Sequence, residues 1–300
     1  MDYSKLLILD GASGTELESK VKLHPKLWSA VALKDDPAVV FDLHKAYFDA
    51  GANVATTVTY QASYQGLGEI GASPVEIDEL FRSAVILAKQ AAAASSTSQP
   101  KYVAGGLGPY GAFLCQGQEY TGDYAGVNDS TLRAFHEPRI RAIASAQPDV
   151  LLFETIPNIQ ELRIIMSLVK ELGLKIPIWV CFSIKVGADG LVTLADGTSL
   201  ELATSEAKDA EAIGANCFAP EHAERVLSQI RANTPQPLIL YPNSGEVYDA
   251  HEKSWHAAQG HSTHFSHDLN TLHRMYGLAI AGGCCRTTTE DIRQMASAID

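Results

Sequence analysis

Eight short apolar runs recur along the whole chain, and this repetition constrains the fold more than any other feature of the sequence. Each run is bounded by Gly, Pro or Asn, as expected of short strands. Continuous apolar runs of this length are typical of strands that are buried on both faces of a parallel sheet. The sequence therefore predicts eight buried strands, at residues 6–11, 52–58, 102–108, 149–155, 177–183, 214–219, 237–243 and 278–285.

The segments between these runs carry helix signals. In residues 36–51, Asp36 is a suitable N-cap, Pro37 stands at the first helical position and Gly51 is a C-terminal stop. Strand followed by helix, repeated eight times, is typical of an α/β protein with a single (β/α)8 TIM barrel. We therefore predict one domain over residues 1–300, with further helices within residues 73–96, 158–173 and 223–235.

Composition excludes several classes of partner. The formal net charge is −12, with 23 basic and 35 acidic residues, and no basic cluster is dense enough to follow a phosphate backbone. We expect no nucleic acid and no membrane partner, because no apolar run is long enough to span a bilayer. The N-terminal apolar run is too short for a signal peptide, so we expect a cytoplasmic protein.

The cysteine content fits the expectation of a cytoplasmic protein. Their number is odd, and the chain shows no export signal, so a disulfide framework is not expected. The remaining interpretations are buried small hydrophobic residues and metal ligands. The five are Cys115, Cys181, Cys217, Cys284 and Cys285.

The strand ends gather the polar residues of interest. In a parallel barrel the C-terminal ends of all strands meet on one face, and chemistry lies there. Three of the five cysteines fall in this group. In chain order the predicted strand ends carry Asp10, Thr57, Thr59, Gly106, Gly108, Glu154, Ser183, Asn216, Cys217, Asn243, Cys284 and Cys285.

Three thiolates from two strand ends can surround a tetrahedral zinc ion and leave its fourth position open, as in a catalytic site. We expect Gly282 and Gly283 to give the backbone the freedom to turn both Cys284 and Cys285 toward one ion. The alternative is that Cys217 and the adjacent pair are small buried apolar side chains. Outside this group, we interpret Cys115 and Cys181 as packing or loop residues.

A trithiolate zinc is a weak Lewis acid for activating water, but it suits a substrate thiol, which it holds as a nucleophilic thiolate. The pattern therefore favours alkylation of a bound thiol. Asp10 and Glu154 need a cationic partner if they are buried, and an amino-acid ammonium group fits. The alternative is that both carboxylates have structural roles: Asp10 as a turn residue before Gly11, and Glu154 as a cap of the helix after Pro157.

Five motifs on separate strand ends resemble the homocysteine S-methyltransferases over essentially the whole chain. They are LDGASGTELE (9–18), FETIPN (153–158), NC (216–217), YPNSGE (241–246) and GGCCRT (282–287). The resemblance implies a zinc-dependent barrel that transfers a methyl group from a sulfonium donor to homocysteine, giving methionine. It also implies Cys217, Cys284 and Cys285 as zinc ligands, and Asp10 with Glu154 as the residues that hold the homocysteine amino group.

Two further positions, Thr59 and Asn243, are predicted to line the substrate pocket from their places at strand ends. One departure from the family pattern is Ala12, where a second glycine is usual. EYTGDY (119–124) and SWH (254–256) are similar to the branch that uses S-methylmethionine or S-adenosylmethionine as donor.

The predicted reaction is an in-line displacement that needs no catalytic residue beyond the metal site, because the leaving group is a neutral thioether. Trp28, Tyr60 and Tyr120 are candidates to face the sulfonium, or else core and rim residues. A non-catalytic zinc- or thiol-binding barrel stays open as an alternative. A zinc hydrolase is disfavoured, because no histidine lies at the eight strand ends.

Two stretches are atypical. Residues 109–131 are rich in Gly, Tyr and polar residues, so we predict a long loop over the active face. Residues 244–268 hold five histidines, which we interpret as solvated surface residues rather than metal ligands. These histidines are His251, His256, His261, His264 and His267.

Overall fold

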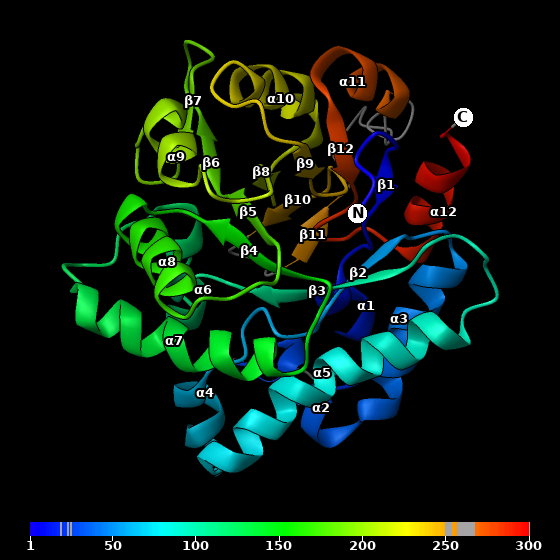
Figure 1. The fold of residues 1–300 in the computed structure, drawn as a ribbon, viewed down its shortest axis with the longest axis vertical. Coiled ribbons are helices and arrows are strands. Elements are labelled where there is room, and N and C mark those ends of the chain that lie inside the picture. Colours follow the sequence, from blue (N-terminus) through cyan, green and yellow to red (C-terminus); the bar gives the residue numbers. More distant parts are fainter. Residues whose placement is uncertain (19, 23, 25, 250–253, 257–267, 300) are drawn as a thin grey trace.

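A sheet of eight parallel strands forms the centre of the computed structural model (Figure 1), which describes residues 1–300 except 19, 23, 25, 250–253, 257–267 and 300. The sheet order is β1-β12-β9-β8-β5-β4-β3-β2, and a parallel bridge between Leu9 and Val54 joins its two edges. All eight predicted strands are confirmed. They are β1 (Leu7–Ile8), β2 (Val54–Thr56), β3 (Tyr102–Leu107), β4 (Val150–Ile156), β5 (Ile178–Phe182), β8 (Ala212–Asn216), β9 (Leu238–Tyr241) and β12 (Leu278–Ala281).

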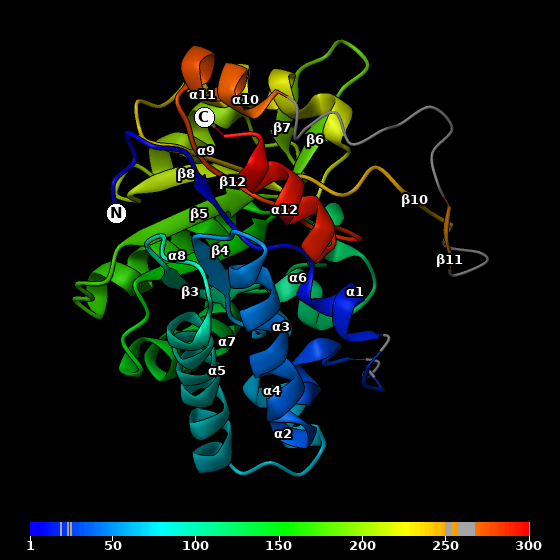
Figure 2. The same cartoon turned by 90° about the vertical axis from the view of Figure 1, so that its right-hand side faces the viewer.

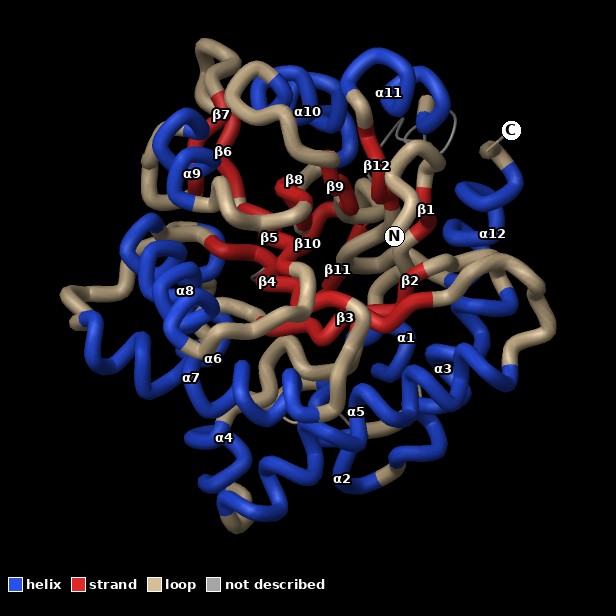
Figure 3. The backbone as a smooth tube through the Cα atoms, viewed as in Figure 1, coloured by secondary structure: helices blue, strands red, loops and turns tan. Residues whose placement is uncertain are grey.

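Helices surround this barrel (Figure 3), and the predicted Asp36 cap forms. The Asp36 side chain accepts a hydrogen bond from the backbone N–H of Val39 at the start of α3, and Ser73 with Glu76 forms a capping box on α5. The described helices are α1 (Ser13–Glu18), α2 (Ala32–Asp35), α3 (Pro37–Asp49), α4 (Tyr64–Glu69), α5 (Pro74–Ala94), α6 (Tyr110–Leu114), α7 (Asp129–Ser145), α8 (Ile159–Glu171), α9 (Leu200–Glu206), α10 (Ala223–Arg231), α11 (Leu269–Tyr276) and α12 (Thr289–Ser297).

The barrel interior is packed with side chains rather than hollow, as expected for this fold. Leu9, Val54, Leu152, Trp179 and Ile239 from five different segments form one buried cluster. A larger cluster joins the outward faces of the strands to the inward faces of the helices. The predicted (β/α)8 fold is therefore confirmed.

Two antiparallel hairpins are not predicted from the sequence. One joins β6 (Ile184–Val186) to β7 (Val192–Leu194), and the other joins β10 (Val247–Asp249) to β11 (Ser254–His256). Figure 2 shows that the second hairpin projects from the end of the barrel where α1 and α6 also lie. His251, His261, His264 and His267 lie outside the described residues, and His256 is described only as a part of β11.

The prediction of a continuous loop over residues 109–131 is wrong in part. The stretch contains α6, a 3-10 helix η2 (Gln118–Tyr120) and the first residues of α7. The physical reason is aromatic packing, because the rings of Tyr110 and Phe113 contact the ring of Phe135 on α7. The segment thus packs against α7 through its aromatic side chains.

None of the described helices is long and apolar enough to cross a membrane.

Candidate metal centre and substrate site

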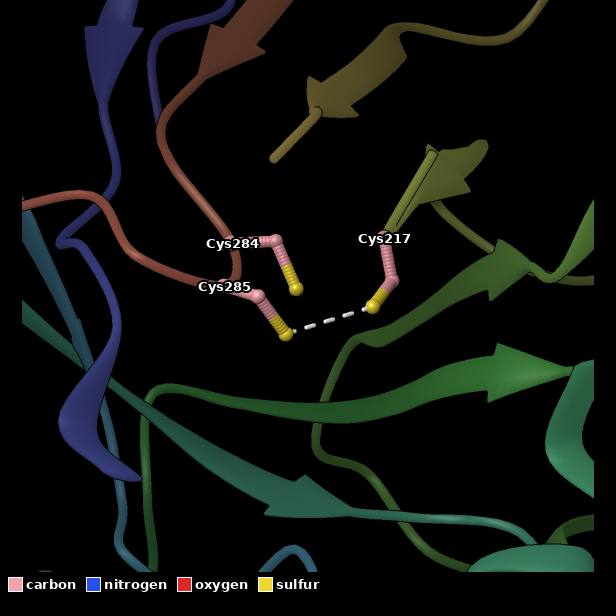
Figure 4. A group of neighbouring side chains, drawn as sticks. All are labelled: Cys217, Cys284 and Cys285. Carbon is pink, nitrogen blue, oxygen red and sulfur yellow. Dashed lines mark hydrogen bonds between the residues drawn. The ribbon is translucent and has the colours of Figure 1, made fainter. Parts of the chain in front are cut away.

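Three cysteine thiols meet at the C-terminal ends of β8 and β12 (Figure 4). Their Sγ atoms all lie within 4.8 Å of one another, and the Sγ atoms of Cys217 and Cys285 are 3.6 Å apart. Thiolates at a Zn–S distance of about 2.3 Å in a tetrahedral shell lie about 3.8 Å from one another. The spacing of Cys217, Cys284 and Cys285 therefore fits one tetrahedral metal ion with a fourth position left over.

The ionisation of these thiols leads to the same interpretation. The hydrogen bond to Cys217, with that to Cys284, holds the pKa of Cys285 well below its ordinary value, whereas the hydrogen bond to Cys217 raises the pKa of Cys284. One thiolate in the group therefore opposes the ionisation of its neighbours. A cation at the centre of the group removes this opposition, because it attracts all three thiolates.

The turn that presents the adjacent cysteines depends on tight packing rather than on glycine flexibility. Neither Gly282 nor Gly283 has a positive φ, and the left-handed residue is Arg286, at φ 67°. A Cβ on Gly283 would lie 2.3 Å from Thr287 Oγ1, and one on Gly282 would lie 2.6 Å from Leu9 Cβ. The expected role of the two glycines in backbone freedom is therefore replaced by close approach, which lets the turn fold against β1.

A strained backbone position lies at the end of β4. Thr155 has φ 58°, which is costly for a β-branched residue, and Cys217 has φ 59°. The Asn216 side chain stabilises Thr155, because its Oδ1 accepts from Thr155 N–H at 2.8 Å and its Nδ2 donates to Thr155 Oγ1 at 2.9 Å. The pairing register with β5 shifts between Phe153 and Ile156, so Glu154 lies in an irregular part of the strand. Neither Thr155 nor this role of Asn216 is apparent from the sequence.

The two predicted carboxylates are buried at this end of the barrel. Asp10 is 2% exposed and accepts a hydrogen bond from Thr56 N–H at 2.8 Å, and Glu154 is 8% exposed and accepts one from the Tyr241 hydroxyl at 3.3 Å. Burial raises the pKa of Asp10 well above its ordinary value and the pKa of Glu154 to about 7. Among the described residues, no Lys or Arg forms an ion pair with either group, so a bound cation would stabilise both.

The ordinary roles considered for these carboxylates do not match the structure. The α8 helix is capped by Asn158, whose side chain accepts from Gln160 and Glu161 N–H, and not by Glu154. The Asp10 carboxylate reaches across to β2 rather than closing its own turn. Both groups therefore accept hydrogen bonds from other strands of the barrel, Asp10 from β2 and Glu154 from β9.

The two weaker candidates differ from each other. Thr59 is fully buried, and its hydroxyl donates to the Gly106 carbonyl at 2.6 Å and lies 2.7 Å from Thr57 Oγ1, so it joins β2 to β3. Its predicted contact with substrate stays a prediction. The Asn243 Oδ1 atom is buried and has no hydrogen-bond partner among the described residues, so it is available to accept a hydrogen bond from a ligand.

Of the three aromatic candidates, Tyr120 lies at the cysteines. Its hydroxyl is 3.2 Å from Cys217 Sγ, which places a residue of η2 beside a predicted metal ligand. The Tyr60 ring packs at Gly108, where a Cβ would lie 2.6 Å from Tyr60 Cδ2. Trp28 packs on α1 at Gly14 and is 40% exposed.

With this geometry, the chain matches known proteins over its whole length. A model of the family described as homocysteine S-methyltransferase matches residues 7–299. The chain belongs to the homocysteine S-methyltransferase family. It is 37% identical to the homocysteine S-methyltransferase YbgG of Bacillus subtilis, over 99% of this chain and 95% of that protein. It is 36% identical to the homocysteine S-methyltransferase of Escherichia coli, over 97% of this chain and 94% of that protein.

The fold of this chain also matches that of a solved homocysteine methyltransferase structure. The metallated form of the homocysteine methyltransferase MmuM from Escherichia coli superposes with a TM-score of 0.85 at 32% identity, covering 98% of this chain and 96% of that one. The predicted family is confirmed. The roles predicted for individual residues, and zinc as the metal, stay predictions.

Proposed function

We propose that this homocysteine S-methyltransferase transfers a methyl group from a sulfonium donor, S-methylmethionine or S-adenosylmethionine, to the thiol of homocysteine, giving methionine. The observation that carries this proposal is the meeting of three thiols with two buried carboxylates that lack a cationic partner among the described residues. The thiols are suited to a thiol substrate through a metal, and the carboxylates to an ammonium group. Homocysteine carries both groups.

The metal we propose is zinc, held by Cys217, Cys284 and Cys285. When bound there, zinc would keep the substrate thiol deprotonated and nucleophilic at neutral pH. Two findings support a metal at this place: the spacing of the three Sγ atoms and the metallated form of the Escherichia coli relative.

Asp10 and Glu154 are proposed to hold the homocysteine ammonium group. Each carboxylate accepts a hydrogen bond from another strand of the barrel, Asp10 from β2 and Glu154 from β9, so little side-chain freedom is lost on binding. The free Oδ1 of Asn243 is a further acceptor for the substrate. Because these residues lie on the same barrel end as the cysteines, an amino acid of the length of homocysteine is oriented with its sulfur toward the thiols.

The methyl transfer itself is an in-line displacement. A C–S bond forms between the homocysteine sulfur and the methyl carbon, the bond from that carbon to the sulfonium sulfur breaks, and its electron pair stays on the departing sulfur as a neutral thioether. The departing thioether is neutral, so no general acid is needed, and the thiol proton leaves to solvent before the transfer, so no general base acts in the displacement. The chain contributes the positions of the two reactants, because aligning them lowers the entropic part of the barrier.

We further propose that residues 1–300 work as one homocysteine-binding domain in the cytoplasm.

The test is methionine formation by reduced, zinc-loaded protein from homocysteine, with S-methylmethionine, S-adenosylmethionine and betaine as parallel donors. The proposal predicts product with a sulfonium and little with betaine. Cys285→Ser is expected to lose zinc and activity together while staying folded, because the site is added onto a large core. Cys115→Ser is the matched control, since Cys115 is exposed and lies outside the cysteine group. Zinc binding without product from any donor would contradict the proposal.

A further inference from the structure

Residues 110–124, here called the covering segment, are fixed at both ends by one buried carboxylate. Glu161 of α8 accepts a hydrogen bond from Tyr110 N–H at 2.5 Å and another from the Tyr124 hydroxyl, and its Oε1 lies 2.7 Å from His136 Nε2. The Gly122 carbonyl accepts from Asn158 Nδ2 at 2.8 Å. The covering segment is therefore held at a defined place beside the cysteines.

Within the covering segment, Glu119 stands out for its environment. Its Oε2 atom is buried and has no hydrogen-bond partner among the described residues. No Lys, Arg or His among the described residues forms an ion pair with this carboxylate. The backbone beside it is tightly packed, because a Cβ on Gly111 would lie 2.6 Å from Glu119 N. Burial raises the pKa of Glu119 above its ordinary value.

Glu119 lies at the reacting end of the site. The next residue, Tyr120, places its hydroxyl 3.2 Å from Cys217 Sγ. Burial together with the charge of Glu119 raises the pKa of Tyr60 well above its ordinary value. Glu119 thus directly precedes the residue that contacts the cysteine group, and its charge acts on Tyr60.

A buried carboxylate without a cationic partner is costly unless a cation arrives with a ligand. The proposed reaction brings two positive centres to this end of the barrel. One is the ammonium group of homocysteine, for which Asp10 and Glu154 are already placed. The other is the sulfonium of the methyl donor, which must lie at the homocysteine sulfur and therefore beside the cysteines.

We propose that Glu119 is the counter-ion of the donor's sulfonium sulfur, and that the rings of Tyr60 and Tyr120 complete the site for this cation. Aromatic faces attract cations, at partly exposed positions such as that of Tyr120 as well as at buried ones. This inference rests on the proposed function, and it names how that site distinguishes a charged donor from a neutral thioether.

The kinetic consequence follows from the loss of charge during transfer. The sulfonium is fully positive when bound, partly positive in the transition state and neutral in the product. Glu119 therefore stabilises the bound donor more than the transition state, so it lowers the KM for the donor without raising kcat. It also favours release of the thioether, because the product no longer carries the charge that Glu119 binds.

The experiment compares zinc-loaded wild type, Glu119→Gln and a control, Glu137→Gln, which removes an exposed carboxylate paired with Arg141. Calorimetry measures the Kd of S-methylmethionine and of methionine, which differ by one methyl group and the charge on sulfur. We expect Glu119→Gln to weaken S-methylmethionine at least tenfold and methionine by less than twofold. In turnover, the KM for S-methylmethionine rises by about the same factor, kcat stays unchanged or rises, and the KM for homocysteine stays within twofold.

Equal effects on both ligands, or no effect on either, would overturn the inference. The binding comparison decides it even if wild type forms no methionine, a result that would count against the proposed function alone. If wild type forms methionine and Glu119→Gln behaves like the control, the proposed function stands and the role of Glu119 is refuted. Unchanged zinc content in the variant shows that the cysteine group is intact.

Discussion

Replacing Glu154 by Gln should stabilise the metal-free protein at alkaline pH and leave it nearly unchanged in acid. The pKa of Glu154 is raised by burial from 4.5 to about 7. At 1.36 kcal/mol per pKa unit, ionising this carboxyl in the folded state costs about 3 kcal/mol more than in the unfolded chain. The Gln side chain has the same shape and cannot ionise, so the variant does not carry this cost.

The sign follows from proton binding. Because the folded-state pKa lies above the unfolded value, the folded protein binds more protons between pH 4.5 and 7. Wild type therefore loses stability as the pH rises through this window. Most of the window lies between pH 5 and pH 8, so we expect wild type to lose about 2 to 3 kcal/mol relative to Glu154→Gln over this range. Asp10 has a raised pKa as well, but it is present in both proteins and largely cancels in the comparison.

The assay is urea unfolding of reduced, zinc-free wild type and Glu154→Gln at pH 5 and pH 8, analysed for the free energy of unfolding. Parallel pH dependence in the two proteins would refute the reasoning, because it would mean that Glu154 ionises without cost. Turnover gives an independent check. Loss of the carboxylate should raise the KM for homocysteine at least tenfold, since a charge-assisted hydrogen bond to the substrate ammonium is removed.

Three other predictions follow from the packing around the site. Gly283→Ala should lower zinc affinity at least tenfold, because its Cβ would lie 2.3 Å from Thr287 Oγ1 and displace the turn before Cys284; Gly68→Ala, at an open position, is the control, and competition with a chelator measures both. Asn216→Ala should destabilise the protein by about 2 to 3 kcal/mol in urea unfolding, since it leaves the buried Thr155 N–H without a partner; an unchanged midpoint would contradict this. Glu119→Gln should raise the melting temperature of the ligand-free protein, because an unpaired buried carboxylate is removed, and a lower melting temperature would argue against its being unpaired.

Local signals in the sequence were sufficient to predict the barrel. Each strand is a continuous apolar run, and helix starts such as that of α3 carry their own cap in Asp36 and Pro37, so short windows of sequence contain the information. The β6–β7 hairpin was missed although Asp189 and Gly190 form a turn signal between its strands, with Gly190 at φ 81°.

The site was predictable only as far as strand ends meet on one face. This rule brings Cys217 to Cys284 and Cys285, which the structure confirms as a group. The strained turn at Thr155 has no sequence signal, because the side chain that stabilises it, Asn216, lies far away along the chain. The place of Tyr120 beside Cys217 likewise depends on the covering segment, whose ends are fixed by Glu161 on another helix. Contacts between such distant positions are decided by packing and not by spacing along the chain.

The central claim is that three thiolates hold a zinc ion that accepts the homocysteine sulfur. X-ray absorption at the zinc edge, on protein with and without homocysteine, tests it most directly. The account predicts three sulfur neighbours at about 2.3 Å in the free protein and four with homocysteine bound. A sulfur count that does not change when homocysteine binds, or zinc retained after Cys285→Ser with the same sulfur count, would contradict it.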